Sequence, residues 1–143
     1  MIPAISETTQ GPGTLDSYFA NLAIDNNEVS PSFSHTIEST EEPHWWKAEF
    51  KTTVHITKFT VVARIENEER LENIKVFTVL YNTRVGQGAQ TEENLLADLN
   101  DISTTARKTF EVTNAVMADE ILFKRFVTGD NVMNFAEIYI WGY

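Results

Sequence analysis

Three side chains with hydrogen-bonding tips, His35, Arg64 and Arg70, are the residues of this 143-residue chain best suited to bind a ligand. They lie on either side of a mostly apolar run, 45–63, that has the character of β-strand. Such a run can carry residues that are far apart in sequence to one end of a fold. An imidazole and two guanidiniums in one place form a dense group of hydrogen-bond donors, which suits a small ligand covered in hydroxyl oxygens. The pattern therefore indicates recognition of a polyol by a rigid β scaffold rather than bond cleavage.

Composition limits the classes of partner. The chain has 21 acidic and 11 basic residues and a formal net charge of −10, so no basic cluster can neutralise the phosphates of nucleic acid or of an anionic membrane. No apolar run is long enough to span a bilayer, and we expect no membrane insertion. The absence of cysteine excludes disulfides, zinc thiolates and cysteine nucleophiles. With 42% hydrophobic residues, 1–143 is expected to fold as one domain with a sizeable core.

Short alternating segments predict a fold made of β-strands. Apolar residues occupy even positions over 46–50, and the apolar phase slips within 54–63, which predicts a bulge near Thr57 and Lys58. The run 74–81 is apolar on both faces, as in a central strand covered on both sides. Many short strands with little helix predict an antiparallel β-sandwich of about eight strands with its terminal segments close together. Further strands are expected over 108–113, 120–126 and 136–141.

Two segments are expected to be helical. A short helical turn is predicted over 16–22. A longer helix is predicted over 91–102, where Thr91 is a residue type that caps helix N-termini. The apolar residues that recur at helical spacing behind it are Leu95, Leu96, Leu99 and Ile102.

The order of the motifs resembles the F-type lectins, or fucolectins, which belong to the wider discoidin group. The resemblance covers about 15–143 and is strongest over 23–71. It implies an all-β fold, an antiparallel jelly-roll β-sandwich of the galactose-binding-like type with one or two short helical turns. It also implies binding of terminal L-fucose or a related sugar by His35, Arg64 and Arg70 at one end of the barrel. The motifs are Ala-Ile-Asp-Asn-Asn at 23–27, His35-Thr36, Pro43 with the pair Trp45-Trp46, Arg64, and Arg70-Leu71.

The segment between the two arginines departs from the family pattern. It reads Arg-Ile-Glu-Asn-Glu-Glu-Arg over 64–70, where the family usually has Arg-x-Asp and often two adjacent cysteines. Glu66 stands where an acidic partner would orient Arg64, because an opposite charge fixes a guanidinium fork. The other reading is a solvated salt-bridge loop in which the glutamates pair with the arginines and fill the pocket. His44, in the neighbouring segment, is either a bystander or a residue that flanks the pocket.

The same resemblance implies a structural calcium ion, Ca²⁺. Calcium takes about six to eight oxygen ligands, which mix carboxylates, hydroxyls and carbonyls. By position, the family's ligands correspond to the main-chain oxygens of Leu22 and Asn27 and to the side chains of Asp25, Ser32 and Glu137. The alternative is an ordinary Asx-turn at the aspartate, which forms without any ion. The match at Glu137, so distant in sequence, favours calcium.

No catalytic motif is present in the sequence: there is no Gly-x-Ser-x-Gly elbow, phosphate loop or His-Glu-x-x-His. We therefore expect a protein that is not an enzyme. The first functional class is a sugar-binding module with glycans, including fucosylated ones, as partners; it would act as a homo-oligomer or within a larger multidomain protein. The second is a discoidin-type structural, interaction or adhesion module whose sugar pocket is lost or altered. The resemblance implies an extracellular or cell-surface location, although no signal-peptide pattern is expected at the N-terminus.

Overall fold

The computed structural model describes residues 1–40, 43–82, 90–99, 106–127 and 132–143, and within them the chain is built almost entirely from strands. Every strand pair in these ranges is antiparallel, which confirms the predicted all-β class. The strands are β1 (Ile5–Gly11), β2 (Ser34–His35), β3 (His44–Val62), β4 (Ile74–Asn82), β5 (Gln90–Asp98), β6 (Arg107–Arg125), β7 (Asn134–Phe135) and β8 (Glu137–Gly142). The two short 3₁₀ helices are η1 (Ala20–Ile24) and η2 (Glu68–Leu71).

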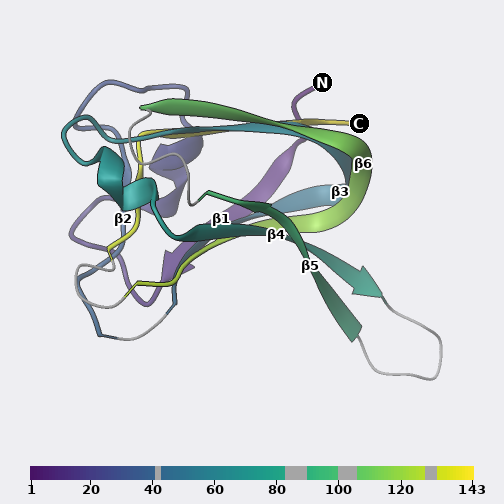
Figure 1. The fold of residues 1–143 in the computed structure, drawn as a ribbon, viewed down its shortest axis with the longest axis horizontal. Helices are drawn as coiled ribbons and strands as arrows, with labels where there is room; N and C mark the ends of the chain where they lie inside the picture. The colour runs from purple at the N-terminus through teal and green to yellow at the C-terminus, as the bar shows by residue number, and fades with distance from the viewer. Residues whose placement is uncertain (41–42, 83–89, 100–105, 128–131) are drawn as a thin grey trace.

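Two long strands, β3 and β6, take part in both layers of the sandwich. The first half of β3 pairs with β1 and with the second half of β6, whereas its second half pairs with β8 and with the first half of β6. The sheet order is β1-β3-β6-β4-β5, with β8 also paired to β3. Figure 1 shows β3 and β6 curving round at one end of the molecule, so one continuous sheet folds over on itself.

Irregular pairing marks the place where β3 bends. The register of β3 against β6 shifts between Ile56 and Lys58, which confirms the predicted bulge, and also between Glu49 and Val54. An extra residue in one strand bends that strand and increases its twist. These two irregularities therefore let β3 pass from one layer into the other. The expected strands 108–113 and 120–126 are parts of a single strand, β6, which makes the same passage.

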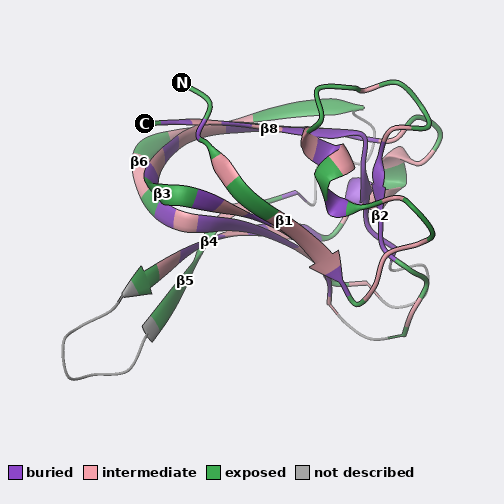
Figure 2. Cartoon of the chain, turned by 180° about the vertical axis from the view of Figure 1, so that it is seen from behind, coloured by how far each residue is buried: buried purple, intermediate pink, exposed green. Residues whose placement is uncertain are grey.

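Aromatic side chains fill the space between the layers. The ring of Phe123 makes edge-to-face contacts with those of Trp46, Phe59 and Phe135, at centroid distances of 5.6, 5.9 and 5.4 Å. The indole Nε1 of Trp46 also donates to the main-chain oxygen of Ala20 at 2.9 Å, which anchors η1 to this core. Figure 2 shows the buried residues continuing along β8 and β2. The helix η1, which leads to the candidate sites, is therefore attached to a rigid aromatic core.

The predicted helix over 91–102 is wrong in its described part. Residues Gln90–Asp98 form β5, which pairs with β4. Of the apolar residues at helical spacing, Leu95 is exposed and Leu99 is buried, whereas Ile102 lies outside the described residues. The available edge of β4 supplies backbone partners to this segment, so tertiary pairing overrides a local helical pattern.

Two further expectations need adjustment. The helical turn expected over 16–22 is displaced, because η1 begins at Ala20 and ends at Ile24. β4 does lie inside the sheet, between β6 and β5, as a central strand should. Its outward face is only half covered, however, and the ring of Phe77 on that face lies 5.1 Å from the Nζ of Lys124.

The two ends of the chain lie side by side, as predicted. The main-chain nitrogen of Gly142 donates to the oxygen of Met1 at 2.9 Å. Figure 1 shows both ends at the side of the molecule away from β2. Among the described residues, no helix is long and apolar enough to cross a membrane.

Candidate binding sites

The short strand β2, which carries His35, is held by three other segments. His35 pairs with Asn134 of β7 across the small two-stranded sheet. Its main-chain nitrogen donates to the oxygen of Tyr18, and its oxygen accepts from the nitrogen of Leu15, both at 3.0 Å. The same oxygen accepts from Nε2 of Gln10 at 3.0 Å. The backbone at His35 is therefore held on both sides, by β7 and by the segment that precedes η1.

The imidazole of His35 contacts Arg70 directly. Nη1 of Arg70 lies 3.3 Å from Nε2 of the ring, and Nδ1 lies 2.7 Å from the main-chain oxygen of Thr36. A guanidinium can only donate, so Nε2 must accept, and Nδ1 carries the hydrogen that is donated to Thr36. The ring, which is buried, is thus held as the neutral Nδ1–H tautomer with its other nitrogen toward Arg70.

Arg64 contacts the ring of Phe33, which is also a neighbour of the His35 imidazole. Its Cζ lies 4.2 Å from the ring centroid of Phe33, a cation–π contact. Phe33 stacks on Tyr18 at 4.4 Å between centroids, and its ring lies 6.2 Å from that of His35. The main-chain oxygen of Arg64 accepts from the nitrogen of Asn67 at 3.1 Å, which closes a turn at the start of the 64–70 segment. The structure therefore gathers His35, Arg64 and Arg70, the three predicted sugar-binding residues, around Phe33 and Tyr18.

The glutamates of this segment do not neutralise the arginines. Among the described residues, no ion pair joins Arg64 or Arg70 to Glu66, Glu68 or Glu69. Glu66 is exposed and has a φ of 70°, a left-handed conformation that is uncommon for a residue with a side chain. The filled-pocket reading of the sequence, in which these carboxylates occupy the guanidiniums, finds no support in the described residues.

His44 lies behind the site rather than on its surface. It is fully buried, and its Nδ1 lies 2.7 Å from Oγ1 of Thr36, the residue whose main-chain oxygen binds His35. Oγ1 of Thr36 also accepts from the main-chain nitrogen of Met133 at 2.9 Å. His44 is thus part of the polar network beneath the imidazole, where it holds the backbone that orients His35.

Arg125 is a supporting residue that was not expected from the sequence. Its guanidinium is buried and donates to three main-chain oxygens, those of Glu72 at 3.1 Å, Val132 at 2.7 Å and Glu69 at 3.4 Å. Glu69 and Glu72 lie on either side of Arg70 in the chain, and Val132 belongs to the segment that enters β7. Arg125 therefore ties the helix that carries Arg70 to the strand that pairs with His35.

One sequence signal could have revealed Arg125. In β6 it shares the inward-facing, odd-numbered phase of Ile121 and Phe123, so a charged residue stands on the core side of an apolar strand. Asn134 carries no such signal. It is buried directly opposite His35, and both polar atoms of its amide have no hydrogen-bond partner among the described residues.

The predicted calcium ligands also come together. Oδ1 of Asp25 and Oε2 of Glu137 both accept from the main-chain nitrogen of Asn27, at 2.9 and 3.2 Å. The hydroxyl of Ser32 donates to Oδ2 of Asp25 at 2.5 Å. Leu22 lies one turn earlier, in η1, which ends at Ile24 immediately before the aspartate. Asn27 and Glu137 are 110 positions apart, yet they lie together with Asp25 and Ser32. These four residues are called the cradle.

The electrostatics of this cradle suit a cation. Burial raises the pKa of Glu137 to about 7, with a further contribution from the charge of Asp25 and a partial offset by the N–H of Asn27. The buried carboxylate of Glu137 and the exposed carboxylate of Asp25 therefore lie together, and in the part of the chain that the structure describes no ion pair joins either of them to a cationic side chain. Within the described residues, no three or more His, Asp or Glu side chains gather as a metal site. A mixed oxygen set of two carboxylates, the Ser32 hydroxyl and main-chain carbonyls still fits calcium, which accepts all three kinds of ligand.

A second set of contacts braces the same loop. Oε1 of Glu28 accepts from Nη1 of Arg107 and from the hydroxyl of Tyr139, both at 2.7 Å. The hydrogen bond from Tyr139, together with Arg107, lowers the pKa of the Glu28 carboxyl. The loop after η1 is in this way fixed to both β6 and β8, independently of Glu137.

Comparison with known proteins identifies the fold. No family model and no curated protein matches the sequence. Among solved structures, it is similar to the fucose-binding module SpX-3 of Streptococcus pneumoniae, with 20% sequence identity, a TM-score of 0.72, and 100% of this chain and 98% of that chain covered. It is also similar to a striped bass (Morone saxatilis) serum f-lectin, or fucolectin, with 16% identity, a TM-score of 0.69, and 95% and 45% covered. The chain has the F-type lectin fold.

This fold extends to bacterial carbohydrate-binding modules of family 32. The module from C. perfringens NanJ, solved in complex with galactose, matches with 16% identity and a TM-score of 0.72 over 98% of each chain. At these identities the likeness establishes the discoidin-like β-sandwich itself. The neighbours are sugar-binding modules, in line with the expectation that the chain is not an enzyme. In this chain, the His35 cluster and the group of Asp25, Ser32 and Glu137 are formed mainly by the loops and short elements that join the long strands.

Proposed function

We propose that the chain is a calcium-stabilised carbohydrate-binding module that recognises terminal L-fucose or a related sugar through His35, Arg64 and Arg70. The observation that carries the proposal is the direct contact of Arg70 with His35, beside which Arg64 lies on Phe33. Three polar side chains from β2, η2 and the turn before η2 are thereby gathered at one place. A group of this kind is suited to a ligand with several oxygen atoms on one edge.

Each residue has a distinct task in this proposal. The guanidiniums of Arg64 and Arg70 donate to ring and hydroxyl oxygens of the sugar, since arginine presents its donors in a fixed fork. His35 is already oriented by Thr36, so no freedom of the ring is lost when a sugar binds. The methyl group of a deoxyhexose would rest on an aromatic face, for which the candidate is Tyr18, a partly exposed ring that stacks on Phe33 and lies 6.3 Å from the ring of His35.

Calcium has a structural task. Asp25, Ser32 and Glu137 would hold the ion with their side chains, and Leu22 and Asn27 with their main-chain oxygens. A bound cation supplies the positive charge that the two carboxylates lack and joins the loop after η1 to β8. It would stabilise the backbone that enters β2 without itself touching the sugar.

The partners are glycans, and fucosylated glycans are the first to test. Structural neighbours are described as a fucose-binding module and as a module in complex with galactose, which supports a carbohydrate as the ligand class. A single monosaccharide has few atoms with which to offset its lost translational freedom, so its affinity is expected to be weak. Useful avidity then requires several copies, in a homo-oligomer or in a multidomain protein, at an extracellular or cell-surface location where glycans occur.

A glycan array probed with and without calcium tests the proposal. The wild-type protein should bind fucosylated glycans, and calorimetry with L-fucose should give a saturable heat. Arg70→Ala should lose both signals while it keeps the wild-type circular dichroism spectrum. If the wild-type protein gives neither an array signal nor heat, the structural or interaction module without a sugar pocket becomes the better explanation.

A further inference from the structure

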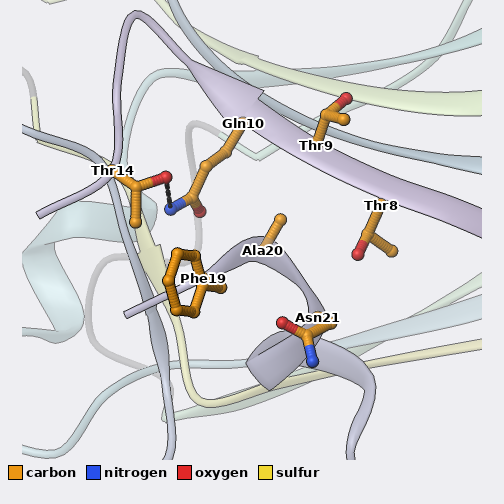
Figure 3. Close-up of a pocket in the computed structure, with 7 residues that line it drawn as sticks. All are labelled: Thr8, Thr9, Gln10, Thr14, Phe19, Ala20 and Asn21. Atoms are coloured by element: carbon orange, nitrogen blue, oxygen red, sulfur yellow. Dashed lines mark hydrogen bonds between the residues drawn. The ribbon is translucent and has the colours of Figure 1, made fainter. Parts of the chain in front are cut away.

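A hollow of about 390 Å³ lies between the edge strand β1 and the start of η1. Figure 3 shows that its side chains come from two walls, β1 and the segment that enters η1. All of its lining residues are uncharged, and most carry hydroxyl or amide groups. They are Thr8, Thr9, Gln10, Thr14, Phe19, Ala20 and Asn21.

Phe19 gives this hollow an aromatic surface. Its side chain is 55% exposed, whereas the adjacent Tyr18 stacks on Phe33 beside His35. An exposed ring next to neutral hydroxyl and amide groups is the combination that receives a sugar, because the ring covers an apolar face while the polar groups bind hydroxyls. Asn21, which is also exposed, supplies an amide to the lining.

Gln10 gives the hollow a fixed acceptor. Its Nε2 donates to Oγ1 of Thr14 at 3.0 Å and to the main-chain oxygens of Tyr18 at 2.9 Å and His35 at 3.0 Å. Three acceptors around one nitrogen settle the orientation of the amide, so Oε1 must face the other way. Oε1 of Gln10 has no hydrogen-bond partner within the described part of the chain. A buried acceptor without a partner is unfavourable, and a hydroxyl that enters the hollow would relieve it.

The hollow is adjacent to the His35 cluster. The same Gln10 amide that lines the hollow binds the main-chain oxygen of His35, and Tyr18 and Phe19 follow each other in the chain. We propose that the hollow binds a second neutral hexose unit, next to the sugar held by His35, Arg64 and Arg70. This inference rests on the proposed function and extends it from a terminal sugar to an oligosaccharide.

Two variants at exposed positions test the second site. Phe19→Ala and Asn21→Ala should bind L-fucose within about twofold of wild type, but should bind at least one fucosylated oligosaccharide about tenfold more weakly by calorimetry. Tyr143→Ala is the matched control, since it removes an aromatic ring that is 72% exposed and stacks on His55 at the far end of the molecule. In NMR spectra of wild type, amide signals of 8–21 should shift further with the oligosaccharide than with L-fucose.

The outcomes separate this inference from the proposed function. If wild type binds L-fucose but Phe19→Ala and Asn21→Ala bind every oligosaccharide as wild type does, the second site is wrong and the first stands. If Arg70→Ala still binds oligosaccharides and Phe19→Ala does not, the hollow is the sugar site and the role given to His35, Arg64 and Arg70 is wrong. If wild type binds no sugar at all, both are overturned.

Discussion

Nη1 of Arg70 lies 3.3 Å from Nε2 of His35, so these residues form one hydrogen-bonded unit although they are 35 positions apart. The imidazole comes from β2 and the guanidinium from η2, two elements that do not pair with each other. Arg125 connects them indirectly, because it binds the backbone of η2 and the segment that enters β7, the partner of β2. The geometry of the unit therefore depends on residues outside it.

Removing either arginine should abolish sugar binding with little effect on stability. We expect Arg64→Ala and Arg70→Ala to lose detectable calorimetric heat with L-fucose, because both side chains are partly exposed and, in the proposed site, would donate to the sugar. Their melting temperatures should stay close to that of wild type. Lys108→Ala, which removes an exposed positive charge on β6, is the control for charge alone and should bind normally. Unchanged affinity in both arginine variants would contradict the site.

Replacing Glu68 and Glu69 together with Ser should leave affinity for L-fucose within about twofold of wild type, or improve it. Neither carboxylate forms an ion pair with Arg64 or Arg70 in the described residues, so neither holds a guanidinium in place. Calorimetry on the double variant measures this directly. A large loss of affinity would mean that these glutamates orient the arginines after all.

Calcium should raise the melting temperature. An ion that binds only the native state adds about 2.7 kcal/mol to the free energy of unfolding at a hundredfold excess over its Kd. EDTA should therefore lower the melting temperature of wild type and change that of Asp25→Ala much less. Asp16→Asn, at an exposed aspartate outside the cradle, should respond to EDTA as wild type does. Identical melting curves for wild type with and without the chelator would rule out a stabilising ion.

In the absence of calcium, stability should fall as pH rises from about 4.5 towards 7. Burial, together with the charge of Asp25, raises the pKa of Glu137 from 4.5 to about 7, so in this range the native protein holds a proton that the unfolded chain has released. Deprotonation therefore favours unfolding as pH rises. Denaturant titrations in EDTA across this window measure the slope. Glu137→Gln should show a smaller slope, and an equal slope would assign the effect to other groups.

Gly142→Ala should destabilise the fold by about 1–3 kcal/mol, because it forces extra volume into a packed position. A Cβ at this position would collide with the main-chain oxygen of His55, which belongs to β3 and has no side-chain freedom with which to move away. Gly13→Ala is a matched comparison, since its Cβ would meet a methyl group of Ile37, an exposed side chain that can turn aside. Chemical denaturation of both variants should show a clear loss only for Gly142→Ala. If the two variants were equally stable, the backbone of β8 would have to shift readily to make room for the added methyl group.

The sequence predicted those parts of the structure that depend on local alternation. The even-numbered apolar face of 46–50 and the slip at Thr57 and Lys58 reproduce the course of β3, because the side chains of a strand alternate between its faces regardless of its partners. The helix predicted for the segment containing Leu95 and Leu99 was wrong for the converse reason. Its local pattern fits a helix, and only the free edge of β4 makes it a strand.

The candidate sites divide in the same way. Asp25 and Glu137 were associated through a family pattern, and the structure brings them to one amide nitrogen. The contact of Phe33 with Arg64 could not be foreseen, and although the phase of β6 marks Arg125 as inward-facing, nothing in the sequence indicates that it binds the backbone beside Arg70. Both are contacts between a loop and a distant element, set by how the layers pack rather than by spacing along the chain.

The pairing of Met1 with Gly142 determines how the domain would face its surroundings. Because both ends of the chain leave the molecule on the side away from β2, any tether attached to either end would run away from His35 and its neighbours (Figure 1). In a chain of several such domains, the His35 side of each domain would therefore face outward, and no linker would cover it. The length of the linkers between domains, rather than the orientation of each domain, would then decide which clustered glycans can be bound at the same time.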